Sequence, residues 1–101
     1  MINVSQPYLK LIKAILKKHV PNTEVWVFGS RLTKRIKKYS DLDLAIVSNQ
    51  NISAKKMNAL KDKFAESNLP FRVDLLDWNT ITKEFKSIIK KKYKIIQKRK
   101  K

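Results

Sequence analysis

The chain has 101 residues, a length that suits one small domain with a single hydrophobic core. It carries 24 Lys and Arg against 8 Asp and Glu, and it lacks Cys, which excludes disulfides and thiolate metal sites. No apolar run could span a membrane and the first residues lack a signal-peptide pattern, so a cytoplasmic protein is expected. The net charge of +16 favours anionic partners, although 20 of the 24 basic residues are Lys, which AT-rich codon usage alone could produce.

The first third of the chain predicts a helix followed by a strand. Ser5 is a plausible helix cap, and apolar residues then recur at three- and four-residue steps as far as His19. We interpret His19 as structural, and Pro21 ends the helix. Residues 24–28 are rich in strand-forming side chains.

The middle of the chain predicts a second strand, a helix and a third strand. The basic segment 31–38 is expected to form one or two helical turns, and residues 41–47 form the second strand. A long helix begins at Ser53 and closes before Pro70. Residues 71–76 then form the third strand.

The last part of the chain predicts one more helix and a basic end. Asp77 is the expected cap of a helix whose apolar stripe starts at Ile81. Residues 90–101 hold eight Lys or Arg among twelve residues. They form either an extension of that helix or a short extended piece with a frayed tail. The element order α-β-α-β-α-β-α predicts an α/β domain with a small sheet.

Aspartates stand at or beside the predicted strands, where Asp is a poor strand former. Asp41 and Asp43 are two residues apart, so on a strand both point to the same face. Two adjacent carboxylates repel unless a cation joins them, and Mg²⁺ prefers oxygen ligands. Asp74, from a neighbouring strand, would complete a two-metal site suited to in-line displacement at phosphorus.

A second motif lies where the first predicted strand ends. Gly29 lets the backbone approach a ligand closely, and Ser30 can hold phosphate through its hydroxyl and the N–H groups of the following turn. Arg31 can add a charged fork to the same phosphate.

Gly29-Ser30, ten residues and then Asp41-x-Asp43 resemble the signature of the minimal nucleotidyltransferases, the smallest members of the polymerase β-like superfamily. The resemblance runs from about residue 8 to residue 96. It implies a mixed-sheet nucleotidyltransferase domain over residues 1–97, followed by a basic tail at 98–101.

The resemblance also implies the roles of the site residues. Gly29, Ser30 and Arg31 would hold the nucleotide phosphates. Asp41, Asp43 and Asp74 would bind Mg²⁺, with two ions expected, and would form the catalytic triad.

The reaction implied by the resemblance moves AMP from ATP to an acceptor hydroxyl and releases pyrophosphate. Family members commonly act as antitoxins paired with HEPN-domain ribonuclease toxins, and some adenylylate a toxin tyrosine. A hetero-oligomer with a HEPN toxin encoded nearby is therefore expected. The chain departs from the family pattern at residues 32–35, which are bulkier, and at Lys91-Lys92, which replace a frequent glycine.

Two alternative functions stay open at this stage. One is a non-catalytic antitoxin that neutralises its partner by contact, against which the intact Asp41, Asp43 and Asp74 argue. The other is a basic nucleic-acid-binding protein, which the net charge permits. It is not favoured, because the sequence lacks a helix-turn-helix spacing, a zinc motif or an aromatic-rich sheet signature.

Overall fold

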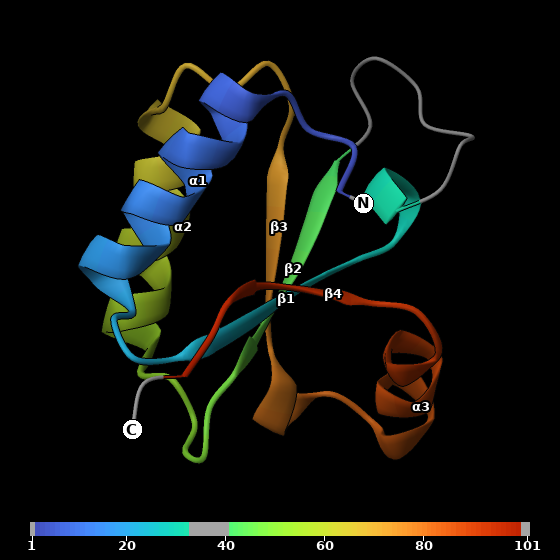
Figure 1. Cartoon of the computed structure of the whole chain (residues 1–101). Coiled ribbons are helices and arrows are strands. Elements are labelled where there is room, and N and C mark those ends of the chain that lie inside the picture. Colours follow the sequence, from blue (N-terminus) through green and yellow to red (C-terminus); the bar gives the residue numbers. More distant parts are fainter. Residues whose placement is uncertain (1, 33–40, 100–101) are drawn as a thin grey trace.

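A four-stranded mixed sheet with the strand order β3-β2-β1-β4 separates the helices into two groups (Figure 1). The computed structural model describes residues 2–32 and 41–99. Its strands are β1 (Glu24–Phe28), β2 (Leu42–Val47), β3 (Val73–Asp77) and β4 (Lys94–Gln97). Its helices are α1 (Gln6–His19), α2 (Ala54–Glu66) and α3 (Lys83–Lys91), with 3-10 turns at Ser30–Leu32 and Trp78–Thr80. The predicted small mixed sheet flanked by helices is confirmed.

The sheet contains both antiparallel and parallel strand pairs. β1 pairs antiparallel with both β2 and β4, whereas β2 pairs parallel with β3. A parallel pair needs a long crossover, and α2 provides it between β2 and β3. The crossover leaves β3 and β4 as the two outer strands of the described sheet.

One face of the sheet carries α1 and α2, which lie together on the left in Figure 1. Alternate residues of each strand point to this face, and on β2 they are Leu42, Leu44 and Ile46, all fully buried. They pack against the apolar side of α1, including Ile12 and Leu16. This large aliphatic cluster is the main core of the protein.

The opposite face carries α3 and a smaller cluster that is rich in aromatic side chains. Trp26 of β1 stacks on Tyr93 with ring centroids 4.0 Å apart and meets Trp78 edge-on at 5.0 Å. Ala45 of β2 and Ile89 of α3 complete the buried part of this cluster. The residues that could carry chemistry also lie on this face.

Helix caps agree with the sequence prediction at one helix and differ at two others. The Ser53 hydroxyl accepts a hydrogen bond from the Lys56 amide, so the predicted cap of α2 is confirmed. Ser5 occupies the cap position of α1 but makes no capping hydrogen bond with its side chain. The prediction that Asp77 caps the last helix is wrong: Thr82 caps α3.

Several predicted boundaries shift. The second strand begins at Leu42 rather than Asp41, and the third covers Val73–Asp77 rather than 71–76. Of the basic segment 31–38, Arg31 and Leu32 belong to a 3-10 turn and the rest lies outside the described residues.

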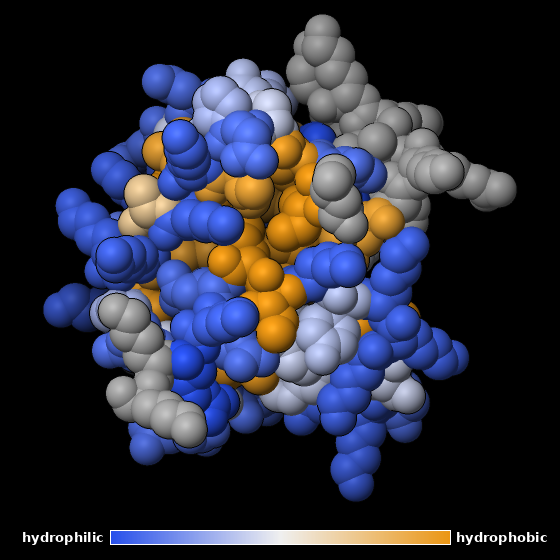
Figure 2. Space-filling model, in the orientation of Figure 1, coloured by the Kyte–Doolittle hydropathy of each residue, from blue (hydrophilic) through white to orange (hydrophobic). Residues whose placement is uncertain are grey.

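The basic end is extended rather than helical after Lys91, because residues 94–97 form β4 against β1. Hydrophilic side chains cover most of the face seen in Figure 2, around a band of apolar surface. Among the residues described, no helix has the length and apolar character needed to cross a membrane.

Candidate active site

Three aspartates meet where β2 and β3 begin, on the face of the sheet that carries α3. Asp43 of β2 is paired in register with Asp74 of β3 on one side and with Phe28 of β1 on the other. Asp41 lies two residues before Asp43. Parallel pairing in this register is what brings the predicted triad together from two segments of the chain.

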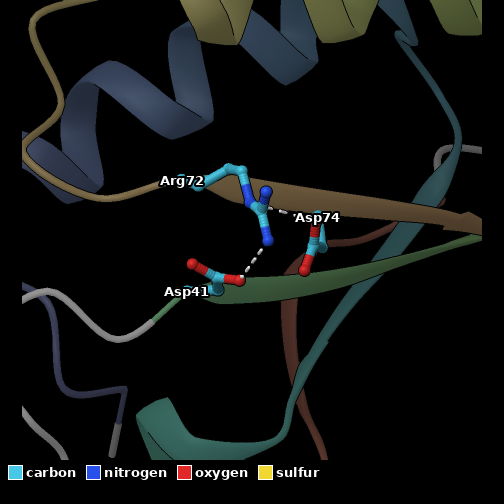
Figure 3. Close-up of polar contacts among 3 residues, drawn as sticks. All are labelled: Asp41, Arg72 and Asp74. Atoms are coloured by element: carbon cyan, nitrogen blue, oxygen red, sulfur yellow. Dashed lines mark hydrogen bonds and ion pairs between the residues drawn. The ribbon is translucent and has the colours of Figure 1, made fainter.

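Arg72 joins two of these carboxylates, as Figure 3 shows. Its Nη2 donates to Oδ2 of Asp41 at 3.0 Å, and its Nε lies 3.7 Å from Oδ1 of Asp74. The hydrogen bond to Asp41, together with the charges of Asp41 and Asp74, raises the pKa of the Arg72 guanidinium. The Arg72 side chain is 75% exposed, so this pairing is open to competition from solvent and from other cations.

Asp43 lies deeper than its two neighbours in the cluster. Burial, followed by the charges of Asp74 and Asp41, raises the pKa of the Asp43 carboxyl from 3.8 to about 6. Burial and neighbouring negative charge both disfavour the ionised form of a carboxylate that has no cation beside it. A cation bound at this cluster would offset the repulsion among the three carboxylates and favour the ionised form of Asp43.

Gly29 makes room for the Asp43 carboxylate. Its φ is +84°, in the region that favours glycine, and a Cβ built at this position would collide with Oδ2 of Asp43. The structure therefore gives a second reason for glycine at this motif, beyond the approach of a ligand. Nothing larger can stand here while Asp43 keeps its position.

The other two residues of the Gly-Ser-Arg motif have different surroundings. The Ser30 backbone begins a 3-10 turn, but its side chain lies outside the described part of the structure. Arg31 is 6% exposed, and its guanidinium lies 4.1 Å from the ring centre of Phe71. Its Nη1 also donates to the carbonyl of Asn3 at 3.1 Å. These contacts tie Arg31 to the packing of the N-terminal segment, and its predicted role in phosphate binding stays a prediction.

The donor chemistry of the three carboxylates suits Mg²⁺, which takes carboxylate oxygens together with the phosphates of a nucleotide. As they are placed, however, no group of three His, Cys, Asp or Glu within residues 2–32 and 41–99 forms a ready metal site. Arg72 is paired with two of the three acids. The assignment of Asp41, Asp43 and Asp74 as metal ligands stays a prediction.

Arg72 was not among the site residues predicted from the sequence, and the predicted role of Asp77 was wrong. The two-residue spacing of Arg72 and Asp74 indicates that they share a face of the strand, and this spacing could have revealed Arg72. Its closer partner, Asp41, lies on another segment of the chain. Asp77 is buried, and its carboxylate accepts from the amides of Ile52 at 2.9 Å and Asn79 at 3.0 Å. Asp77 therefore stabilises a loop and a 3-10 turn.

The fold and the strand-end acids define a nucleotidyltransferase. A profile of the family described as "Polymerase beta, Nucleotidyltransferase" matches residues 10–101. The chain belongs to this family, and the resemblance noted in its motifs is confirmed.

One relative and two solved structures make the comparison more specific. The relative, from Haemophilus influenzae, is named probable protein adenylyltransferase MntA; it is 46% identical over 100 residues, which cover 99% of this chain and 88% of the relative. A complex described as tri-AMPylated Shewanella oneidensis HEPN toxin with MNT antitoxin has a TM-score of 0.69 at 22% identity, covering 92% of this chain and 71% of that one.

A second structure, described as a toxin-antitoxin with AMP-PNP, has a TM-score of 0.75 at 22% identity, covering 89% of this chain and 73% of that one. At these identities the two solved structures show a shared fold.

Proposed function

We propose that this protein is a Mg²⁺-dependent protein adenylyltransferase that transfers AMP from ATP to a hydroxyl of a HEPN-domain toxin in the cytoplasm. The observation that carries the proposal is the meeting of Asp41, Asp43 and Asp74 beside Gly29. It is supported by the 46% identity to a relative named as a protein adenylyltransferase.

The reaction is a displacement at the α-phosphorus of ATP. The acceptor oxygen forms the new bond to phosphorus, the bond to the pyrophosphate oxygen breaks, and pyrophosphate leaves. Mg²⁺, when bound, would neutralise the phosphate charge that develops in this displacement.

The residues of the chain bind and orient the two reactants. Gly29 lets the Asp43 carboxylate lie against the backbone of the expected phosphate-binding motif, because any side chain there would collide with it. The proton of the acceptor hydroxyl passes to a carboxylate at the strand ends. Asp74 is suited to this role, since it belongs to an outer strand that an acceptor can reach.

The proposed partner comes from solved structures that share this fold. One solved structure pairs an MNT antitoxin with an AMPylated HEPN toxin. Another is a toxin–antitoxin variant in which two aspartates, two positions apart, are replaced by glutamate, and the same spacing separates Asp41 and Asp43. We therefore propose a hetero-oligomer with a HEPN toxin as the working form.

The test is transfer of label from α-³²P-ATP to the HEPN toxin in the presence of Mg²⁺. The native chain should label the toxin, and EDTA should abolish labelling. Asp43→Asn should lower the rate by about 10²- to 10³-fold, the scale of lost transition-state electrostatics.

The matched control is Asp77→Asn, which changes an aspartate of the same sheet that binds backbone amides instead. Its transfer rate should equal the native rate at a temperature where both are folded. Toxin neutralised without any label would contradict the enzyme and favour the non-catalytic antitoxin.

A further inference from the structure

A groove of about 520 Å³ runs along the outer side of β3 and includes Asp74, one of the three acids, in its lining. Five consecutive residues line one wall, from Phe71 to Leu75, and both Arg72 and Asp74 are among them. The opposite wall comes from the second half of α2 and the loop after it, at Lys61, Phe64, Ala65 and Leu69. The groove is therefore continuous with the site already described.

The backbone of β3 offers hydrogen-bonding groups to this groove. The amide of Leu42 donates to the carbonyl of Arg72 at 2.8 Å, so the peptide groups of Arg72 face β2. Successive residues of a strand present these groups to opposite edges, so those of Val73 and Leu75 face outward. No strand within the described residues pairs with this edge.

The strand order sets the two substrates on opposite sides of Asp43. Gly29 follows β1, which pairs with one side of β2, whereas Asp74 lies on β3, which pairs with the other side. Triphosphate bound at Gly29 therefore approaches Asp43 from the side away from the groove. Beyond Asp74 lies the open outer edge of β3, which the groove borders.

We infer that the groove binds an extended segment of the acceptor protein, which adds as a further strand to β3 and presents its hydroxyl beside Asp74. This inference rests on the proposed adenylyltransferase function. Strand addition gives affinity through main-chain hydrogen bonds and specificity through pockets for alternate side chains.

The lining of the groove indicates which segment fits. Phe64, Phe71 and Leu75, each less than one-tenth exposed, form an apolar floor that suits apolar side chains of the segment. Lys61 supplies positive charge at the α2 wall, whereas Arg72 is already paired with Asp41 and Asp74. A segment with apolar side chains toward this floor and an acidic residue within reach of Lys61 matches both features.

The experiment fills the groove without touching the acids. Ala65 is an exposed residue of α2 that lines the groove, and Ala59 is an exposed residue of the same helix that does not. Ala65→Trp should raise the KM for the HEPN toxin by about tenfold or more, with the affinity for ATP unchanged. Ala59→Trp, the matched control, should leave both quantities at the native values.

Hydrogen exchange of the complex gives a second, independent measurement. The amides of Val73 and Leu75 should exchange more slowly when the toxin is bound to the native chain. The same amides should stay unprotected with Ala65→Trp.

Each other result has a separate meaning. Equal KM values for the toxin in the two Trp variants would overturn the groove as the acceptor site while leaving the adenylyltransferase intact. A weakened affinity for ATP in Ala65→Trp would assign the groove to the nucleotide, and self-association lost in that variant would assign it to a second copy. Absence of transfer by the native chain would contradict the proposed function itself.

Discussion

The two faces of the sheet are built from the same strands but have different roles: one stabilises the fold, and the other carries the candidate site. Toward α1 and α2, strand β2 presents Leu42, Leu44 and Ile46, which are completely buried. Toward α3 it presents Asp43 and Ala45, beside a smaller cluster with partly exposed aromatic rings. One face therefore holds most of the burial that stabilises the fold, and the other can leave charged groups open at the strand ends. A one-residue shift in strand pairing would exchange the two faces, so the register protects both properties.

The largest expected difference between the faces is in stability. Leu44→Ala removes a fully buried side chain from the main core and should lower the free energy of unfolding by about 3–4 kcal/mol. Leu76→Ala makes the same change on the α3 face, where the side chain is partly exposed, and should cost about 1 kcal/mol. Urea denaturation measures both. Equal losses would contradict the division of roles between the faces.

Gly29→Ala, a change on the α3 face beside the aspartates, should lower the free energy of unfolding by about 2 kcal/mol. The substitution forces a side chain into a positive φ and into the Asp43 carboxylate. Transfer activity should fall as well, because Asp43 must move. Activity assays on samples shown to be folded by circular dichroism separate the two effects. A fully active and stable variant would show that Asp43 can shift freely.

Deprotonation of Asp43 should make the metal-free protein less stable as pH rises. The folded pKa is about 6, against 3.8 in the unfolded chain, so the folded state binds more protons between these values. Stability from this group is present below pH 4 and is lost as pH rises through 6.

Asp43→Asn should remove this loss of stability. The variant should therefore become more stable relative to the native protein as pH rises from 4 to 7. After discounting for solvent screening at this partly exposed carboxyl, we expect about 1 kcal/mol. Melting curves at several pH values with EDTA measure the difference. A gain that is the same at every pH would point to packing instead.

Loss of Arg72 should have the smallest effect on stability, since its pairs with Asp41 and Asp74 are exposed. Arg72→Gln should nevertheless tighten Mn²⁺ binding, by less than about tenfold, because a competing cation leaves the acids. Electron paramagnetic resonance titration of Mn²⁺ measures the affinity directly. Arg99→Gln removes the same charge away from the acids and serves as the control. Identical affinities in the two variants would mean that Arg72 does not compete with the metal.

The elements that could be predicted from the sequence are those whose structure depends on a local pattern of residues. The apolar run within residues 41–47 predicted the second strand, and the periodic apolar residues of α1 and α2 predicted those helices, because burial of one helix face requires such spacing. The spacing of Asp41 and Asp43 likewise predicted that they share one face of a strand. The two-residue period of β3 also explains why Asp74 lies on the side away from Val73 and Leu75.

The structures of the C-terminal segment and of the Asp77 region depend on contacts between residues far apart in the chain. The segment 90–101 could not be assigned from its own lysines, and β4 forms because residues 94–97 find β1. Its Gln97 side chain also donates to the carbonyls of Val20 and Thr23. Asp77 was misassigned for the same reason, since its partner Ile52 lies 25 residues away. Pairings of this kind leave little trace in the local sequence.

The position of β4 has a consequence for how the chain assembles. Gln97 and its partner Val20 are 77 residues apart, so closing this contact carries a larger entropy loss than forming the neighbouring β2-α2-β3 unit. Until β4 docks, the outer edge of β1 is open, and an open strand edge pairs readily with other chains. The lysines on and around β4 repel such pairing between two unfinished molecules. Part of the large positive charge of this protein therefore protects it from aggregation while it folds.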